Sequence, residues 1–381
     1  MINALFYYSK LTIGGAEKSS VRMINALSNK SWKIDLLLDS SGGELEKYVD
    51  SKVKIYYLYK NAYGNRIKSS KNIVEKLLLI FPYIYSKIRK LFVITKMCLN
   101  RYDFSGILLH STNAGLISKF FNAKIKAHWI RNDLSFCDPQ FKITKNILKY
   151  SKNIDYYICV AQTVKDSLLN RCPELTPKAI VLYNFLNKDE MLQLSTIGEN
   201  PYKKDTVNIL SVCRIVDFSK GVFRMLDICD ILYKEGLKFA WHIIGDGKDF
   251  DELKRRTKLL NLENIFLLHG QEINPFPFYK YADFSAVLSY FEGLCGIVNE
   301  SKIMGIPVIA TEFSGIYEQL TNGINGVVVA NNQDAILVEM RKMILDENYR
   351  KKFRNTIYPT AIIDDNYKLE VLEKIIGEVQ Q

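Results

Sequence analysis

The hydrophobic positions of the chain fall into short apolar runs that alternate with longer amphipathic segments. The runs have the length of strands and are apolar at consecutive positions, as expected for strands buried on both faces of a parallel sheet. The amphipathic segments repeat their apolar residues every three or four positions, which is typical of helices packed on such a sheet. The runs that predict strands are residues 2–8, 33–38, 53–58, 106–110, 155–160, 180–184, 208–213, 239–244, 264–268, 284–290, 306–311 and 326–329.

Strand and helix patterns alternate along nearly the whole chain, which predicts βα units and parallel sheets. Residues 195–205 interrupt the alternation, because they lack periodicity and are rich in Gly, Asn, Pro and Lys, as linkers are. A chain of 381 residues is long enough for two domains that each bury a core. We therefore predict an α/β protein with a first domain over residues 1–196 and a second over residues 207–360.

The cysteines and histidines give no sign of a metal site or a disulfide framework. The seven cysteines are odd in number, form no C-x-x-C pair and lie mostly within apolar strand or helix patterns. The four histidines have no mutual spacing typical of a metal site. The N-terminus predicts a strand rather than a secretion signal, and the apolar run over residues 77–86 is too short to span a bilayer. These features favour reduced thiols and a cytoplasmic protein.

The net charge of +11 is concentrated in the first half of the chain. Residues 1–200 hold 30 basic and 16 acidic groups, whereas residues 201–381 hold 22 basic and 25 acidic groups. Residues 51–101 alone hold twelve basic groups and a single acid, Glu75. Such asymmetry predicts a negatively charged partner for the first domain.

Nucleic acid is one class of anionic partner, but the sequence has no helix-turn-helix, zinc-finger or RNA-recognition motif. An anionic membrane surface fits better, because residues 76–100 interleave Leu, Ile, Phe and Tyr with Lys87, Arg89, Lys90 and Lys96. The same pattern also describes an ordinary amphipathic helix that packs on a sheet. The sequence leaves both interpretations open.

Two carboxylates at a fixed spacing stand out in residues 289–311. Glu292 follows a predicted strand, and Glu300 lies in the helical pattern that follows a turn at Gly293 and Gly296. A strand, a glycine turn and a helix together aim backbone N–H groups at a bound phosphate. Both glutamates would then face the same crevice. Taken alone, the pair is equally consistent with a turn residue and a helix-start acid.

Two cations occupy the first βα loop of the second domain. Arg214 follows the strand at residues 208–213, and Lys220 precedes the next helical pattern. Two cations beside a helix N-terminus can neutralise a diphosphate, although each one alone is more often a solvated charge. Further along, Gly245 opens a Gly-Asp-Gly turn that lacks the remainder of a G-x-G-x-x-G fingerprint, so it does not indicate a nicotinamide cofactor.

These motifs, in this order, resemble those of the family-4 retaining glycosyltransferases of the GT-B fold, the glycosyl transferases group 1. The E-x7-E segment of that family corresponds to Glu292 and Glu300, and its R-x(n)-K-G pair corresponds to Arg214 and Lys220. Residues 245–247 are similar to the family's G-D-G turn, and residues 14–17 are similar to its first loop. The resemblance implies two doubly wound, Rossmann-like domains that face each other across a cleft. It also implies that a helix over residues 366–381 packs back on the first domain.

The resemblance implies a chemistry as well. A sugar would pass from a UDP- or GDP-sugar to an acceptor hydroxyl, with retained anomeric configuration and without a metal or cofactor. The residues assigned to catalysis are Glu292, Arg214 and Lys220, and those assigned to donor binding are Gly15, Gly245, Cys295, Gly296 and Glu300.

The acceptor side is assigned to His128, Arg131 and Asp133, where the chain departs from the family. Arg131 and Asn132 stand where a His usually precedes the Asp. His128 lies three residues before Arg131 and would, by strand alternation, point to the opposite face. Arg131 cannot act as a base, so any role that it has is electrostatic or positional.

The basic first domain favours a glycan acceptor linked to a lipid, extended during synthesis of a surface polysaccharide. The enzyme would then be peripheral, on the cytoplasmic face of the cell membrane. A soluble acceptor, such as a protein or a free sugar, is the alternative. Two other functions stay open: a sugar-nucleotide epimerase of GT-B fold, which needs no acceptor, and a non-catalytic partner subunit, whose only support is Arg131.

Overall fold

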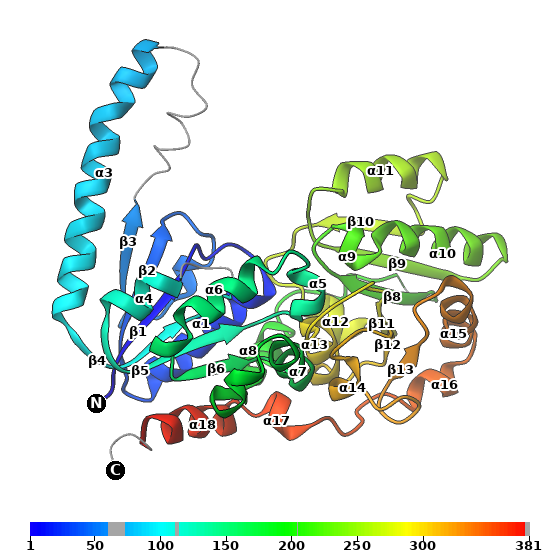
Figure 1. Cartoon of the computed structure of the whole chain (residues 1–381). Helices are drawn as coiled ribbons and strands as arrows, with labels where there is room; N and C mark the ends of the chain where they lie inside the picture. The colour runs from blue at the N-terminus through cyan, green and yellow to red at the C-terminus, as the bar shows by residue number, and fades with distance from the viewer. Residues whose placement is uncertain (60–72, 111–113, 204, 378–381) are drawn as a thin grey trace. The chain divides into compact units, whose positions relative to one another are not determined.

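The structure, a computed structural model, describes residues 1–59, 73–110, 114–203 and 205–377 (Figure 1). It divides into two compact units. The first unit consists of Met1–Val160, Val164–Phe185 and Asn366–Gln381, and the second consists of Ala161–Thr163 and Leu186–Asp365.

The second unit begins ahead of the boundary that the sequence predicts at residue 196. Residues before that point form helix α8 (Lys188–Leu194), which packs against α12 (Phe276–Tyr281) and α13 (Gly296–Ile303) of the second unit. The irregular segment that follows is held there too, because Tyr202 is buried and its hydroxyl donates to the carbonyl of Phe278 at 2.7 Å. The predicted linker is therefore docked on the second unit.

The first unit is built on a seven-stranded sheet whose recorded pairings are all parallel. The strand order β3-β2-β1-β4-β5-β6-β7 reverses between β1 and β4. At such a reversal the loops after the two strands diverge and leave a crevice for ligands. The strands are β1 (Asn3–Tyr8), β2 (Lys33–Ser40), β3 (Lys54–Tyr59), β4 (Arg101–Ile107), β5 (Asn122–Ile130), β6 (Tyr156–Cys159) and β7 (Ala179–Val181).

The second unit repeats this topology with a six-stranded parallel sheet in the order β10-β9-β8-β11-β12-β13. The order reverses between β8 and β11, so a second crevice is expected there. The strands are β8 (Val207–Val212), β9 (Phe239–Ile244), β10 (Phe266–Gly270), β11 (Phe284–Val287), β12 (Val308–Thr311) and β13 (Val327–Val329).

Helices connect successive strands in both units, as the alternating pattern of the sequence predicts (Figure 1). Those that lie largely in the first unit are α1 (Gly15–Asn29), α3 (Ile73–Leu99), α4 (Ala114–Phe120), α5 (Leu134–Cys137), α6 (Lys142–Tyr150), α7 (Gln162–Arg171) and α18 (Asp365–Gly377). Besides α8, α12 and α13, those of the second unit are α9 (Asp217–Lys220), α10 (Val222–Lys234), α11 (Phe250–Leu259), α14 (Ile316–Gln319), α15 (Gln333–Leu345), α16 (Glu347–Lys351) and α17 (Thr360–Ile363). Short 3-10 helices are η1 (Glu46–Tyr48), η2 (Ser151–Asn153) and η3 (Pro173–Lys178).

Aromatic side chains from the central strands of the first unit pack together on one face of the sheet. The ring of Phe104 lies 5.8 Å from that of Phe6 and 6.3 Å from that of Trp129. Gly106 leaves the space for this cluster, since a Cβ there would come within 2.9 Å of both Phe6 and Trp129. The rings on neighbouring strands thus fill one face of the sheet.

Helix α3 has 27 residues and packs along β3. Val93 and Met97 are buried, and the ammonium of Lys90 donates to the hydroxyl of Tyr59 at 2.6 Å. The N-terminal part of α3 extends beyond the end of β3 (Figure 1). Within the ranges that the structure describes, no helix is long and apolar enough to cross a bilayer.

Part of the predicted basic stretch over residues 51–101 lies outside the described residues. This applies to residues 60–72 and to the side chains of residues 73, 75–80 and 82, which include Glu75 and Lys76.

Candidate active site

The reversal of strand order in the second unit brings two loops together. β8 and β11 are neighbours in the sheet, with Phe284 paired with Ile209. The loop after β8 carries Arg214 and leads into α9, which ends at Lys220. The loop after β11 carries Glu292 and leads into α13. The topology thus gathers the three residues to which the sequence assigns catalysis at the carboxyl ends of adjacent strands.

Lys220 and Glu292 form an ion pair between the ammonium and Oε1 of the carboxylate. The hydroxyl of Ser289 donates to the same Oε1 at 3.2 Å. Burial lowers the pKa of Lys220, but the charge of Glu292 outweighs burial and holds that pKa well above its usual value. The lysine is therefore a permanent cation whose position is fixed by a single carboxylate.

Glu300 lies in the second turn of α13 and is half-buried. Its Oε2 accepts a hydrogen bond from the hydroxyl of Tyr279 at 2.8 Å. Burial, followed by the charge of Glu300, raises the pKa of Tyr279 far above its usual value, so the phenol stays a donor. This bond orients the Glu300 carboxylate on the helix that begins beside Glu292.

The prediction for Cys295 requires a correction. Its backbone N–H donates to Oε1 of Gln319 at 3.0 Å, and the carbonyl of Cys295 accepts from Nε2 of the same side chain at 2.8 Å. The thiol is buried, and burial raises its pKa to about 12. The backbone N–H of Cys295, which the sequence assigns to binding of the nucleotide-sugar, is therefore already hydrogen-bonded to Gln319. The next residue, Gly296, is exposed at the start of α13, with open space where a side chain would be.

Gly245 has a backbone role that only glycine fills. Its φ of +141° lies in a region that side chains disfavour, and a Cβ there would lie 1.8 Å from the carbonyl oxygen of Cys213. Gly221 has a related role: its φ is +64°, and a Cβ would lie 2.7 Å from the carbonyl oxygen of Leu288. Both glycines let neighbouring loops approach closely around Arg214 and Lys220.

Arg214 is exposed, whereas Arg224, which the sequence does not single out, is buried. The Arg224 guanidinium donates to the carbonyl of Leu288 and, at 2.6 Å, to Oδ1 of Asn331. It also stacks on the ring of Tyr290, with Cζ 4.1 Å from the centroid. Arg224 therefore holds the loop that carries Glu292, and Arg214 stays free to meet a ligand from solvent. No sequence motif marks Arg224.

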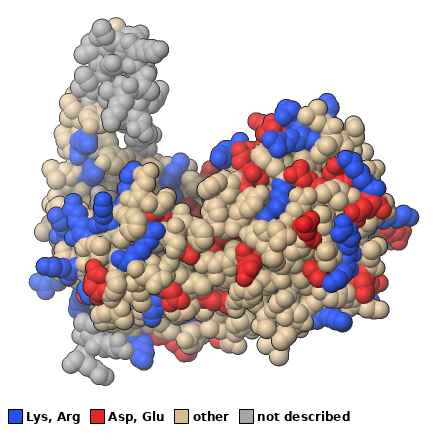
Figure 2. Space-filling model, turned by 45° about the vertical axis from the view of Figure 1, so that its right-hand side comes forward, with Lys and Arg blue, Asp and Glu red and all other residues tan. Residues whose placement is uncertain are grey.

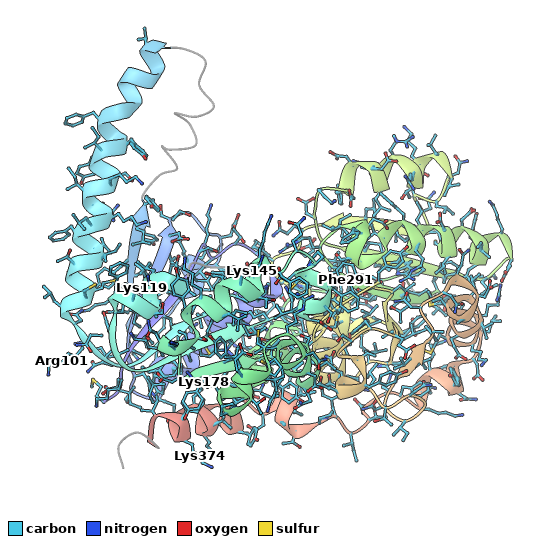
Figure 3. All side chains as sticks on the ribbon, in the orientation of Figure 1. Arg101, Lys119, Lys145, Lys178, Phe291 and Lys374 are labelled. Atoms are coloured by element: carbon cyan, nitrogen blue, oxygen red, sulfur yellow. The ribbon has the colours of Figure 1, made fainter. Side chains whose placement is uncertain are left out.

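Two phenylalanines on the same pair of loops were also not predicted. The rings of Phe218 and Phe291 lie 5.1 Å apart and nearly perpendicular to each other. Phe218 is 73% exposed, and Phe291 directly precedes Glu292 (Figure 3). An aromatic pair with one exposed ring beside cations is suited to contact a base or a sugar.

Arg131 is buried at the end of β5 in the first unit, and its guanidinium is bonded to neutral groups. It donates to the carbonyl of Leu108 at 2.6 Å, to Oδ1 of Asn184 at 2.9 Å and to Oγ of Ser20 at 2.9 Å. Burial lowers its pKa, although the charges of Tyr8 and Glu17 raise it. Arg131 thus ties the loops after β4 and β7 to helix α1.

The two other predicted acceptor-side residues are structural in this conformation. His128 is fully buried, with Nε2 3.4 Å from the carbonyl oxygen of Leu109 and its ring beside that of Tyr157. Asp133 is buried and caps α5, accepting from the N–H of Ser135 at 2.8 Å. The prediction that His128 contacts the acceptor substrate is therefore wrong for this conformation, because the sheet covers the imidazole ring.

His110 lies in the loop after β4 and is not among the site residues that the sequence predicts. It lies where the strand order of the first unit reverses, and its Nδ1 accepts the backbone N–H of Arg131 at 3.3 Å. Gly15 begins α1 beside the same reversal, with open space where a side chain would be. A histidine in the loop that follows a central strand is the signal that could have identified this position.

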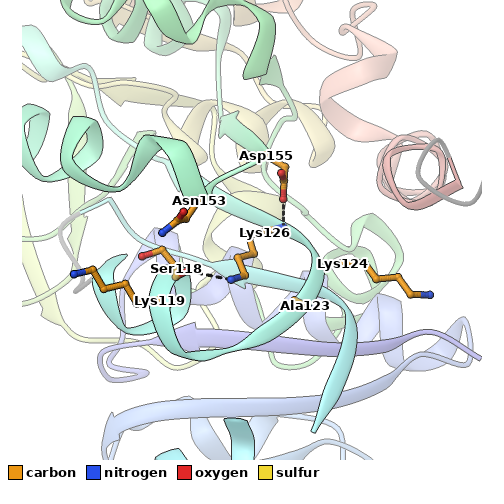
Figure 4. A pocket seen from close by; sticks show the side chains of 7 residues that line it. All are labelled: Ser118, Lys119, Ala123, Lys124, Lys126, Asn153 and Asp155. Atoms are coloured by element: carbon orange, nitrogen blue, oxygen red, sulfur yellow. Dashed lines mark hydrogen bonds between the residues drawn. The ribbon is translucent and has the colours of Figure 1, made fainter. Parts of the chain in front are cut away.

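An open depression of about 480 Å³ lies elsewhere in the first unit, away from the carboxyl ends of the strands (Figure 4). Lys119, Lys124 and Lys126 line it, but Lys124 is paired with Asp103 at 2.8 Å and Lys126 donates to the carbonyl of Ser118 at 3.0 Å. This depression lies at the start of β5 and takes no part in the candidate site. In the part of the chain that the structure describes, no group of three or more His, Cys, Asp or Glu side chains could hold a metal ion.

Comparison with known proteins agrees with this geometry. Residues 196–359, which include both loops of the candidate site, match the family model described as "Glycosyl transferases group 1". The chain is a glycosyltransferase with a group 1 domain. The match covers Arg214, Lys220, Glu292 and Glu300, the residues that carry the resemblance in the sequence.

Relatives of this glycosyltransferase include two bacterial enzymes. A Campylobacter jejuni protein named N-acetylgalactosamine-N,N'-diacetylbacillosaminyl-diphospho-undecaprenol 4-alpha-N-acetylgalactosaminyltransferase is 26% identical, over 98% of this chain and 99% of its own. The lipopolysaccharide 1,6-galactosyltransferase of Escherichia coli is 24% identical, over 65% of this chain and 72% of its own.

A solved structure supports the GT-B fold. Anabaena HepE, crystallised with UDP and glucose, superposes with a TM-score of 0.74 over 99% of this glycosyltransferase and all of HepE, at 14% sequence identity. The predicted fold is confirmed, with two parallel sheets that alternate with helices.

Proposed function

We propose that this glycosyltransferase moves a sugar from a UDP- or GDP-sugar to a hydroxyl of a lipid-linked glycan, with retention of the anomeric configuration. The observation that carries the proposal is the Lys220–Glu292 pair at the strand reversal of the group 1 domain. The Campylobacter relative is named for a diphospho-undecaprenol acceptor, and HepE was crystallised with UDP, which supports both substrate classes.

The residues present can supply the charge that this transfer needs. As the sugar leaves, negative charge grows on the diphosphate, and Lys220 and Arg214 would stabilise it. Glu292 would then release Lys220 to the phosphate and hold hydroxyls of the donor sugar near the reacting carbon. Glu300 would accept hydrogen bonds from the ribose. Two cations already provide the positive charge, so the mechanism assigns no metal and no cofactor.

The acceptor side is proposed to face an anionic membrane. On the face seen in Figure 2, basic side chains gather over the first unit near α3, whereas acidic and basic side chains mix over the second unit. Figure 3 labels Arg101, Lys119, Lys145, Lys178 and Lys374, which come from five different elements of the first unit. A lipid-linked acceptor lies at a membrane surface, where each basic group adds on the order of 1 kcal/mol of attraction. We therefore propose a peripheral enzyme at the cytoplasmic face of the membrane, active in synthesis of a surface polysaccharide.

The test begins with the donor. Thermal unfolding is followed with UDP-, GDP- and ADP-sugars, and the sugar that stabilises the protein is then incubated with and without a lipid-linked glycan. Transfer only in the presence of acceptor supports the proposal. Isomerisation of the donor without acceptor would instead identify an epimerase, and binding of no nucleotide-sugar would identify a non-catalytic subunit.

A further inference from the structure

Helix α3 carries a row of large apolar side chains on a face that is turned away from its sheet. Their exposed fractions range from 49% to 80%, although residues of this kind are normally buried. They recur every three or four positions from Phe81 to Phe92, and Leu99 follows two helical turns later, so they share one side of the helix. We name this row the apolar stripe, and its members are Phe81, Ile84, Tyr85, Ile88, Leu91, Phe92 and Leu99.

The apolar stripe is not the side of α3 that packs on the sheet. A different side of α3 contacts β3, where Ser86, Val93 and Met97 are buried. At about 100° per residue, these three positions lie roughly opposite Phe81 and Ile88. An exposed apolar surface of this length on a protein with a well-packed core marks an interaction site.

The charges at the edges of the stripe indicate the kind of partner. Arg89 and Lys96 lie along one edge and Lys87 along the other, and the sequence from residue 81 to residue 99 contains no acidic residue. If two copies of the chain paired through their stripes, these cations would lie near one another and repel. An anionic surface would instead attract all of them.

We propose that the apolar stripe docks α3 into the surface layer of an anionic lipid bilayer, with the helix axis along the membrane. The apolar side chains enter the boundary between headgroups and acyl chains, and the edge cations contact lipid phosphates. The choice of a membrane rests on the proposed lipid-linked acceptor, but docking requires neither donor nor transfer. The region from residue 81 to residue 99 would lie along roughly 28 Å of membrane surface.

Vesicle co-sedimentation of the full-length protein tests the docking. Binding is expected to vesicles of phosphatidylcholine mixed with phosphatidylglycerol, weakly or not at all to phosphatidylcholine alone, and less at raised salt. Ile88→Ser and Phe92→Ser should each lower the partition coefficient by about tenfold. Lys96→Gln should lower it by about fivefold. The matched controls are Ile357→Ser and Phe120→Ser, which remove exposed side chains of the same types from other elements and should bind as wild type does.

A fluorescence experiment separates insertion from adsorption by charge. Trp32, Trp129 and Trp241 are buried and give a constant background. In a Phe92→Trp variant, the new indole should shift its emission to shorter wavelength on mixed vesicles and be quenched by lipids brominated on the acyl chain. A Phe120→Trp variant should show neither effect. Binding without quenching of the Phe92→Trp variant would overturn the insertion of the stripe.

Sedimentation equilibrium without lipid tests the alternative that a second copy of the chain covers the apolar stripe. The proposal expects a monomer; a dimer that Ile88→Ser dissociates, without vesicle binding by the wild type, would overturn it. Transfer to a water-soluble, short-chain acceptor is measured in parallel and should be unchanged in the stripe variants. Vesicle binding without any transfer would refute the proposed function alone, and transfer without vesicle binding would refute the docking alone.

Discussion

The two units share one strand order, yet the cations at their carboxyl ends are held in different ways. In the first unit, Arg131 is buried and donates hydrogen bonds to a carbonyl, an amide and a hydroxyl of the same unit. In the second unit, Lys220 is paired with one carboxylate, Glu292, and Arg214 beside it is exposed. A common topology therefore supports a closed network in one unit and an open site in the other.

The difference indicates which cation can respond to a ligand. Releasing Arg131 would break its three recorded hydrogen bonds inside the unit, each at a cost of about 1–3 kcal/mol. Lys220 has a partner of full opposite charge, and a diphosphate can take over that role while Glu292 turns to sugar hydroxyls. We conclude that Arg131 organises its unit and that Lys220 acts in the reaction.

The largest effect is expected from Lys220→Ala. Loss of this cation should lower kcat/KM by about two to three powers of ten, because a charge-assisted contact in the transition state is worth roughly 3–4 kcal/mol. Arg214→Ala should act in the same direction. Steady-state transfer with labelled donor measures both variants. The matched control is Lys234→Ala, which removes an exposed lysine of α10, and near-wild-type turnover of Lys220→Ala and Arg214→Ala would contradict the assignment.

The two glutamates are expected to differ in the kinetic constant that they affect. Glu292→Gln should lower kcat by about a hundredfold, because it weakens contacts at the reacting sugar while the fold stays intact. Glu300→Gln should mainly raise KM for the donor, since a ribose contact is shared by ground state and transition state. Tyr279→Phe, which removes the hydroxyl that orients Glu300, should resemble Glu300→Gln in weaker form. Equal kcat values for the wild type and Glu292→Gln would contradict a catalytic role of Glu292 and would indicate that the loop after β11 has only a structural role.

Replacing Arg131 should mainly affect stability. Arg131→Ala removes the guanidinium hydrogen bonds to Leu108, Asn184 and Ser20, so the free energy of unfolding should fall by about 2–4 kcal/mol. Urea denaturation measures the change, with Lys145→Ala as an exposed control on α6. Nucleotide binding to the second unit should be unchanged at temperatures where the variant is folded. If the urea midpoint were unchanged and sugar transfer were lost, Arg131 would be an active-site cation and not a residue that stabilises its unit.

A smaller effect is expected from pH, through buried histidines. Burial lowers the pKa of His110 to about 4 and that of His128 to about 3. Below about pH 6.5 the unfolded chain binds protons that the folded chain does not, so stability falls as pH drops from there towards 4. Each buried histidine contributes on the order of 1 kcal/mol per pH unit in this window. Urea midpoints of the wild type and of His128→Gln should converge as pH falls; parallel curves would contradict the assignment.

The sequence predicts most of the strands, their parallel pairing and the order of the motifs, because these follow from periodicity and from turn residues. Strand β5 is not among the predicted runs, because polar residues interrupt its first half, and β4 begins at Arg101, ahead of the predicted run over residues 106–110. It also assigns Glu292, Glu300, Arg214 and Lys220 to the site, and adjacent strands bring these residues to one edge of the sheet. The partners Ser289 and Tyr279 form recorded contacts with this set, but only the fold shows those contacts.

The rest could not be predicted because it depends on contacts between distant segments. Gln319 occupies the amide of Cys295 from a different helix, and Arg224 reaches the loop after β11 from α10. The burial of His128 likewise follows from its neighbours in the sheet. In each case periodicity correctly predicts the element, and tertiary packing decides what the side chain can reach.

The return of the chain end to the first unit has a consequence for biosynthesis. Residues 366–381 group with the first unit, where Lys368 donates to the carbonyl of Asn184 at 2.8 Å and Leu372 is buried. The ribosome makes the whole second unit in between, which takes roughly ten to forty seconds at the usual rate of about 5–20 residues per second. During that time the apolar surface beneath α18 is uncovered on the nascent chain. The unit that is synthesised first thus completes its core last, and we expect loss of the chain end to destabilise the N-terminal unit.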